Sequence, residues 1–189
     1  MNVFPDAEIH LFEPSKKTFS TLSNNLRDSV KNYGGSVKCN NFGLSDSPST
    51  MTLHYDNENS GLASLYNRQL DYIGIDFSMS ETVTLSTIDE YCSANGITSI
   101  DWLKMDVEGH ELSVLKGAEK ILSRGGINAM QMEFGGCNID SRTYFRDFWN
   151  LLHKDFRVFY TAVDALIEIP QYSELLEIFT TTNFVFIKK

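Results

Sequence analysis

The sequence predicts an α/β fold with a mainly parallel sheet, and two observations carry this prediction. Strand-like segments alternate with segments of helical periodicity through most of the 189 residues, and this alternation is typical of helices packed on a parallel sheet. Hydrophobic residues make up 42% of the chain, which is enough to bury a core. No internal repeat, low-complexity tract or linker interrupts the pattern, so residues 1–189 are interpreted as a single domain.

The first predicted strand is short and ends at an acidic residue. It covers residues 7–12, Glu13 follows it, and Pro14 turns the chain. A helix is predicted next, with Ser15 at its N-cap and the glycines at residues 34–35 as its end. The apolar residues of this helix recur at helical spacing and are Phe19, Leu22, Leu26 and Val30.

The rest of the chain continues the alternation. Strands are predicted over residues 36–44, 47–56, 99–107, 129–134, 157–162 and 182–189. Helices are predicted over residues 111–122 and 142–156. Residues 81–92 are interpreted as a strand that runs into a short helix, with Ser86 or Thr87 at the cap. Residues 57–80 are rich in turn-forming residues and are predicted to be a long loop, which is often functional in a compact domain.

Three predicted strands carry an acidic residue at their carboxyl ends: Glu13, Asp106 and Glu133. Ligands of an open parallel sheet bind outside the carboxyl ends of the strands, so we expect these acids at one rim of the domain. Glu13 either accepts two hydrogen bonds from ribose hydroxyls or is an exposed acid at a strand end. Asp106 could hold a cationic ligand group or take a substrate proton. Lys104 either pairs with a neighbouring carboxylate or is exposed on a strand face.

The stretch LKMDVEGHEL adds further ionisable groups next to Asp106. Glu108, His110 and Glu111 lie near the N-terminus of the next predicted helix, where acids are stabilised by the helix dipole. Stabilisation by the helix dipole explains why an acid stands at Glu111. It does not explain His110 well, because the dipole disfavours a cation at that position. A neutral His110 could serve as a general base, and the alternative is a structural histidine.

Charge and composition exclude several classes of protein. The net charge of −9 argues against nucleic acid or an anionic membrane as the main partner, because both favour basic patches. The N-terminus has no signal-peptide pattern, and no apolar run is long enough to span a membrane. The odd number of widely spaced cysteines indicates free thiols in a cytoplasmic protein, and the isolated histidines predict no metal site.

Several stretches of the chain are similar, in the same order, to those of one enzyme family. LKMDVEGHELSVLKGA looks like its hallmark segment, IHLFEPSKKTFSTLSNNL like its acidic strand end, and NNFGLSDSPSTMTLHY like the strand and hairpin that follow. SGLASL is similar to its Ser/Gly-rich segment, and NFVFIKK to its last strand. The stretches cover nearly the whole chain and resemble the FkbM-type methyltransferases, which use S-adenosylmethionine (SAM). The resemblance implies a class I methyltransferase (Rossmann-like) fold, with an antiparallel last strand and helices on both faces of the sheet.

The resemblance also implies a cofactor site for SAM. Glu13 would hold the ribose hydroxyls, and the turn of Asn41, Phe42 and Gly43 would border the adenine. Asp106 would lie beside the methionine end of SAM. Carboxylates near the sulfonium complement its positive charge, and the acidic net charge is compatible with such a site.

The acceptor implied by the resemblance is a hydroxyl on a sugar, glycan or natural product. Asp106, Glu108 and His110 form the predicted catalytic group, in which Glu108 or His110 would assist deprotonation of the acceptor. Ser60, Ser64 and Glu133 would lie on the acceptor side. The resemblance does not call for a metal.

One motif of the family is absent. A nucleotide-binding sheet starts with a strand and a glycine-rich turn about 20 residues before the acidic strand end, and counting back from Glu13 places that turn before Met1. The chain is therefore expected to lack the usual first strand and helix through N-terminal truncation, and to bind SAM weakly or not at all by itself. The missing strand would leave two edges unpaired, which a second copy of the chain could complete by strand exchange.

Two other functions remain open from the sequence. A non-catalytic remnant of the fold could act as a binding or oligomerisation module through its open edge. A nucleotide-dependent enzyme of another chemistry, such as a dehydrogenase, would share ribose recognition by Glu13. The DVEGHE segment disfavours the dehydrogenase, because hydride transfer does not require it.

Overall fold

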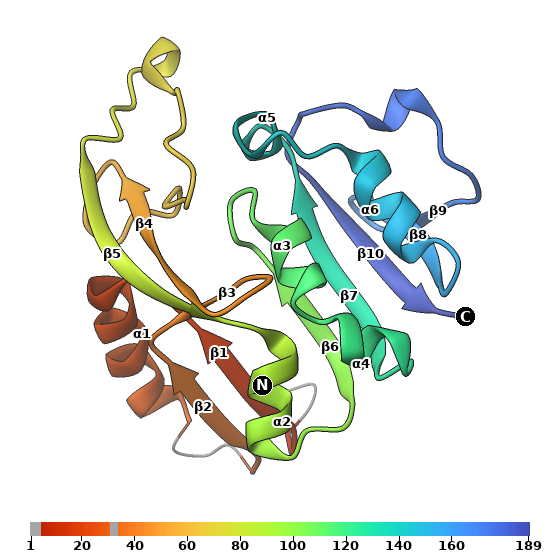
Figure 1. The fold of residues 1–189 in the computed structure, drawn as a ribbon, viewed down its shortest axis with the longest axis horizontal. Helices are drawn as coiled ribbons and strands as arrows, with labels where there is room; N and C mark the ends of the chain where they lie inside the picture. The colour runs from red at the N-terminus through yellow and green to blue at the C-terminus, as the bar shows by residue number, and fades with distance from the viewer. Residues whose placement is uncertain (1–4, 31–33) are drawn as a thin grey trace.

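The computed structural model describes residues 5–30 and 34–189 as a mixed α/β structure (Figure 1). The strands are β1 (Glu8–Phe12), β2 (Ser36–Asn40), β3 (Gly43–Leu44), β4 (Ser49–Tyr55), β5 (Met79–Ser86), β6 (Ile100–Met105), β7 (Ile127–Phe134), β8 (Phe156–Thr161), β9 (Leu166–Ile169) and β10 (Thr182–Lys188). The helices are α1 (Lys16–Ser29), α2 (Ile88–Asn95), α3 (Glu111–Lys116), α4 (Glu119–Ser123), α5 (Cys137–Ser141) and α6 (Phe145–Leu152). Short 3₁₀ helices cover Asp71–Ile73 and Glu174–Leu176. Among the described residues, no helix combines the length and apolar character that a membrane crossing requires.

The sheets are mixed, so the expectation of one mainly parallel sheet was wrong. β1 pairs with β2 in a parallel ladder, and β3, β5 and β4 form a separate three-stranded sheet. The largest sheet has the order β6-β7-β10-β8-β9. Only β6 and β7 are parallel in this sheet. β8 and β9 pair antiparallel, because the connection between them is too short for a parallel crossover. β10 runs antiparallel to both of its neighbours, as expected for the last strand.

β1 and β6 are edge strands that belong to different sheets within the described structure. In Figure 1 both strands, with β2 and β7, point in the same direction, so their carboxyl ends face the same end of the domain. Tyr91 of α2 contacts both strands of the β1–β2 sheet. Its hydroxyl lies 2.7 Å from His10 Nδ1 of β1 and accepts a hydrogen bond from Asn40 Nδ2 of β2 at 3.1 Å.

The main core lies on one face of the five-stranded sheet. The described helices that pack there are α2, α3, α4 and α6, and the buried side chains at the centre include Met130, Phe134, Phe148 and Phe186. On the opposite face, Trp102 is 52% exposed. The described structure therefore covers this sheet with helices on one face, whereas the sequence led us to expect helices on both faces.

The predicted helix over residues 111–122 is broken into α3 and α4 at Gly117. A Cβ atom at Gly117 would lie 1.9 Å from the carbonyl oxygen of Ser45, so the chain needs glycine where these segments meet. The carboxylate of Asp89 caps the second helix by accepting hydrogen bonds from the backbone nitrogens of Lys120 and Ile121 at 2.7 and 2.9 Å. The predicted apolar face is confirmed, because the leucines of both helices pack on the core.

We expect Gly117→Ala to lower the free energy of unfolding by roughly 1–3 kcal/mol, since the added methyl group would displace the Ser45 backbone. Urea unfolding would measure the loss. Gly61→Ala is the matched control, because no heavy atom lies within 4 Å of a Cβ at Gly61, and its effect should stay within about 0.5 kcal/mol. Equal effects of the two substitutions would contradict the proposed close contact.

Local structure differs from the sequence predictions at three further points. The long loop is present, but β5 begins at Met79, so the last two residues of the predicted loop, 79 and 80, belong to a strand. The helix after Glu13 ends at Ser29 with Val30 as its C-cap, and residues 31–33 lie outside the described residues. Gly35 does not end that helix; a Cβ there would lie 2.1 Å from the carbonyl oxygen of Ala7. Neither β9 nor α5 was predicted, because both are short and lack a clear periodicity.

Candidate functional site

The turn between β6 and α3 carries the acidic stretch of the sequence and has a tightly constrained backbone. Glu108 adopts a φ of 50° and Gly109 a φ of 99°, which are left-handed conformations that favour glycine. A Cβ at Gly109 would lie 2.8 Å from the carbonyl oxygen of Cys137. The turn is therefore pressed against the start of α5, and the strained Glu108 is held in place by its surroundings.

Glu111 holds this turn together from inside. Its fully buried carboxyl group accepts hydrogen bonds at Oε1 from the backbone nitrogens of Val107 and Gly109, at 3.1 and 3.4 Å. Its Oε2 atom has no hydrogen-bond partner among the described residues. Burial raises the pKa of Glu111 to about 7, because desolvation disfavours the ionised form. Glu111 thus has a structural role beyond the helix-dipole contact that the sequence suggested.

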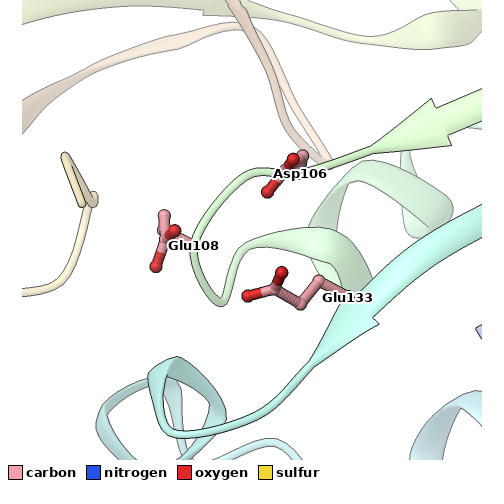
Figure 2. Close-up of side chains that lie close together, drawn as sticks. All are labelled: Asp106, Glu108 and Glu133. Atoms are coloured by element: carbon pink, nitrogen blue, oxygen red, sulfur yellow. The ribbon is translucent and has the colours of Figure 1, made fainter. Parts of the chain in front are cut away.

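Asp106, Glu108 and Glu133 form an acidic cluster at the carboxyl ends of β6 and β7. One carboxylate oxygen from each residue lies within 4.8 Å of the others, and the side chains converge on a shared space (Figure 2). The sequence placed Asp106 and Glu133 at strand ends, and the parallel pairing of β6 with β7 brings these ends together. Each of the three acids is partly exposed or half-buried, so a ligand can approach the cluster.

Two cations neutralise part of the cluster. Lys104 Nζ lies 2.7 Å from Asp106 Oδ2, and Arg68 Nη1 lies 2.7 Å from Glu108 Oε2. Lys104 is both paired with a neighbouring carboxylate and exposed, so both of its sequence interpretations hold. Burial raises the pKa of Glu108 and of Glu133, and the neighbouring carboxylates add to the rise. Three acids against two cations leave an excess negative charge that complements a cationic group of a ligand.

His110 lies buried beneath the acidic turn, with both ring nitrogens engaged. Nε2 lies 2.9 Å from Ser45 Oγ, and Nδ1 lies 3.1 Å from the hydroxyl of Tyr66. Burial lowers the pKa of His110, although Asp46 opposes the change, so the imidazole is neutral near pH 7. The ring therefore links the turn to two other segments of the chain.

The segment 64–68 of the long loop lies against the acidic turn. Ser64 Oγ donates a hydrogen bond to the carbonyl oxygen of Glu108 at 2.7 Å, and its backbone forms a bridge with His54. Arg68 reaches the Glu108 carboxylate from the same segment. Ser60 is apart from this group, because its hydroxyl donates to Asp56 and accepts from the backbone nitrogen of Leu62 within the loop itself. Sequence reasoning missed Arg68, which carries no signal in an irregular loop.

Glu13 and the turn at residues 41–43 form a second group of predicted site residues. Glu13 Oε1 accepts a hydrogen bond from the Ser15 backbone nitrogen at 2.8 Å, and no described residue hydrogen-bonds Oε2. Asn41 Nδ2 donates to the carbonyl oxygen of Glu13 at 2.9 Å. The ring of Phe42 packs edge-on against Phe12, and the buried Gly43 lies in the same turn. Burial raises the pKa of Glu13.

Neither of the two described cavities is lined by a residue of the acidic cluster. A hollow of about 130 Å³ is bordered by the N-terminus of α1 and by Tyr55, Ser60 and Glu81. A larger cavity of about 420 Å³ is lined by Leu115 and Leu122 on the helical face of the main sheet. The carboxyl ends of the strands are the better candidate site, because the converging acids lie there and the larger cavity is lined by none of the predicted site residues.

These features define an α/β domain with an acidic cluster at the carboxyl ends of β6 and β7. The family of the methyltransferase FkbM domain matches residues 2–158, and the chain belongs to this family. The structure is similar to the crystal structure of methyltransferase FkbM from Methylobacillus flagellatus KT, with a TM-score of 0.54 and 18% sequence identity. The similarity covers 95% of this chain and 36% of that chain, so this chain spans about a third of its length. No curated protein sequence matches the chain.

Proposed function

We propose that the protein is a SAM-dependent O-methyltransferase that acts on a hydroxyl of a sugar, glycan or natural product. The observation that carries the proposal is the acidic cluster of Asp106, Glu108 and Glu133 at adjacent strand ends, in a chain of the FkbM family. Its excess negative charge complements a sulfonium. The half-buried setting strengthens this complementarity, because charges interact more strongly where water is partly excluded.

The residues present fit the chemistry of SAM. Oε2 of Glu13, which no described residue hydrogen-bonds, can accept hydrogen bonds from ribose hydroxyls. The neighbouring turn at residues 41–43 offers the Phe42 ring as an apolar border for the adenine. Asp106 keeps an exposed carboxylate despite its pair with Lys104, and this carboxylate suits the cationic methionine end. We therefore assign Glu13 and residues 41–43 to the nucleoside and Asp106 to the methionine portion.

The proposed roles in the reaction follow from burial and contacts. SAM, when bound, supplies an electrophilic methyl group, so the protein needs mainly to align the acceptor oxygen with it. Glu108 is the proposed base for the acceptor hydroxyl, because its carboxylate lies in the cluster and desolvation raises its pKa. His110 positions the turn and remains neutral, since its ring nitrogens already contact Ser45 and Tyr66.

The acceptor side of the site is proposed to lie between the cluster and the long loop. Glu133 faces this space from the end of β7 (Figure 2). Ser64 is buried and holds the loop against Glu108, so it would shape the acceptor site without direct contact. Ser60 borders the smaller hollow and is placed to contact a larger acceptor.

Substitution of the two proposed cofactor contacts tests the function. We expect Glu13→Gln and Asp106→Asn each to weaken SAM binding roughly 10-fold or more, because each removes a charged hydrogen-bond acceptor. Chemical-shift titration of the chain with SAM measures the binding. Asp101→Asn is the control, since Asp101 lies near the amino end of β6 and bonds Asn128. Binding that is unaffected by both site substitutions would refute the assigned site.

A second function is favoured by a separate observation. β1 and β6 are both edge strands in the described structure, and unpaired edges can recruit another strand. In this alternative, the chain is a non-catalytic binding or oligomerisation module. Sedimentation of the protein at several concentrations distinguishes the two: a stable oligomer without any SAM binding supports the module, and SAM binding at the acidic site supports the enzyme.

A further inference from the structure

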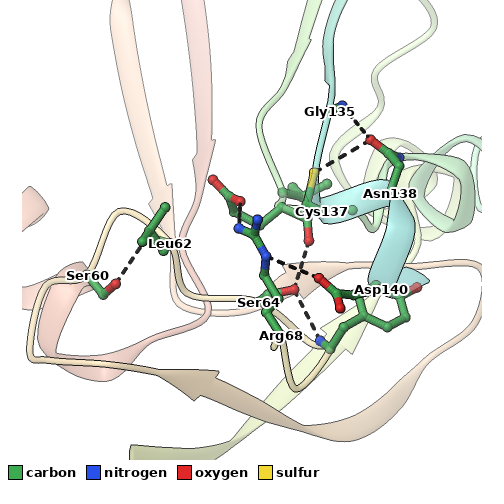
Figure 3. Close-up of polar contacts among 12 residues, drawn as sticks. Ser60, Leu62, Ser64, Arg68, Gly135, Cys137, Asn138 and Asp140 are labelled. Atoms are coloured by element: carbon green, nitrogen blue, oxygen red, sulfur yellow. Dashed lines mark hydrogen bonds and ion pairs between the residues drawn. The ribbon is translucent and has the colours of Figure 1, made fainter. Parts of the chain in front are cut away.

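The side chain of Arg68 bridges two acids that come from different parts of the fold. Its Nη1 atom lies 2.7 Å from Glu108 Oε2, and its Nε atom lies 3.5 Å from Asp140 Oδ2 of α5 (Figure 3). The Arg68 side chain is 9% exposed and that of Glu108 is 14% exposed. Such a pair differs from a surface ion pair, because buried charges require defined partners.

Arg68 is one of three side chains through which the short segment 64–68 contacts the acidic turn. Ser64 Oγ donates to the carbonyl oxygen of Glu108, the Tyr66 hydroxyl contacts His110 Nδ1, and Arg68 contacts the Glu108 carboxylate. The three residues occupy alternate positions of this segment, which bends at residues 65 and 66. The segment 64–68 therefore meets the turn with matched polar groups at successive positions.

We propose that Arg68 is a positioning residue of the candidate site, which directs the Glu108 carboxylate into the acidic cluster and keeps it ionised. Glu108 sits in a left-handed backbone conformation, so its side-chain direction depends on contacts outside the turn. The ion pair with Arg68 supplies the direction, and Ser64 holds the backbone carbonyl of the same residue. The consequence for catalysis rests on the proposed function, whereas the effect on Glu108 does not.

The charges around Glu108 make Arg68 decisive for its ionisation. Asp106 and Glu133 raise the pKa of Glu108 and add to the larger effect of burial, while Arg68 lowers it. The groups that face Glu108 or its partner from the packed elements are Arg68, Asp106, Glu111, Glu133, Cys137 and Asp140. Lys104 pairs with Asp106, and Arg68 is the described cation that lowers the pKa of Glu108, so removal of Arg68 leaves burial and the neighbouring carboxylates to raise that pKa.

The geometry requires arginine and not just a positive charge. The planar guanidinium places one nitrogen against Glu108 and another toward Asp140, and a lysine ammonium is a compact charge on a flexible stem. A Cβ at Gly136 would lie 3.7 Å from Arg68 Nη2, so the guanidinium lies against the start of α5. A lysine would restore part of the electrostatic effect and little of the bridging geometry.

The test is a titration of the Glu108 carboxyl carbon by NMR in the whole 189-residue chain, with the signal assigned from Glu108→Gln. In Arg68→Gln we expect the titration midpoint of Glu108 to move to higher pH, and in Arg68→Lys to move part of the way. Arg157→Gln is the matched control: it removes an arginine–glutamate pair whose side chains are 52% and 43% exposed, and it should leave Glu108 unchanged.

The outcomes separate this proposal from the proposed function. An unchanged midpoint in a folded Arg68→Gln variant, or, if that variant does not fold, in Arg68→Lys, would overturn the positioning role. The titration requires no SAM and no turnover, so a shifted midpoint supports the positioning role even if the chain binds no SAM. Where methyl transfer is measurable, we expect kcat of Arg68→Gln near pH 7 to fall on the order of 100-fold and to recover as pH rises.

Discussion

We expect Phe134→Ala to lower the free energy of unfolding by about 3–5 kcal/mol, because the substitution leaves a large cavity in a packed core. Phe134 is fully buried at the end of β7. Its ring centroid lies 5.6 Å from that of Phe145, 6.3 Å from that of Phe148 and 5.3 Å from that of Phe179. A loss of this size is a large fraction of the 5–15 kcal/mol typical of a domain.

Urea unfolding of wild type and variant measures the effect of Phe134→Ala. Leu175→Ala is the control, since Leu175 is largely exposed and its truncation should change stability by less than about 0.5 kcal/mol. Phe134 follows Glu133 on β7, so the same variant should disturb the acidic cluster while more distant parts of the fold are kept. A loss below about 1 kcal/mol would show that the ring does not belong to the core.

The second prediction with a large expected effect is that the free energy of unfolding depends on pH through the ionisation of Glu111. Burial raises its pKa from 4.5 to about 7 in the folded chain. Below pH 4.5 the carboxyl group is protonated in both states, and its contribution to stability is fully present. Between pH 4.5 and 7 the unfolded chain releases the proton while the folded chain keeps it. The free energy of unfolding therefore falls by roughly 3 kcal/mol over this range.

Glu111→Gln should remove this loss, because glutamine is an isostere of the protonated acid and its carbonyl oxygen can still accept from Val107 and Gly109. We expect the variant to match wild type at pH 4.5 and to be more stable by up to roughly 3 kcal/mol at pH 8. Urea unfolding at both pH values measures the difference. Glu119→Gln on the exposed side of α4 is the control. If the stability of Glu111→Gln varied with pH as that of wild type does, the pH dependence could not be due to burial of the Glu111 carboxyl group.

Local patterns in the sequence were sufficient for the elements that have a strong period or a cap. The helix after Glu13 begins with Ser15 as its N-cap, and the side chain of Ser15 accepts from the Thr18 backbone nitrogen as predicted. Thr87 caps α2 in the same way. The strands β6 and β7 end next to Asp106 and Glu133 because their apolar runs stop there. These features depend on neighbours in the chain, and their physics is visible in a short window.

The sheet order and the helix break could not be predicted, because they depend on residues far apart in sequence. α3 and α4 separate at Gly117 where the Ser45 carbonyl approaches, and no pattern within residues 111–122 reports that contact. The mixed sheet follows from the β8–β9 hairpin and the return of β10 between β7 and β8. Pairing of distant strands is decided by the whole core and not by any one strand.

The sequence by itself determined which residues carry charge at the ends of its strands: Glu13, Asp106 and Glu133 follow apolar runs, and Glu108 and His110 follow Asp106. Only the tertiary structure decided which of these groups are buried and which residues they contact. It buries His110 between Ser45 and Tyr66, and it sets Arg68 from an irregular loop against Glu108. The reason is that ionisation and direction of a side chain depend on its desolvation and on the charges around it, and both arise when distant segments pack together.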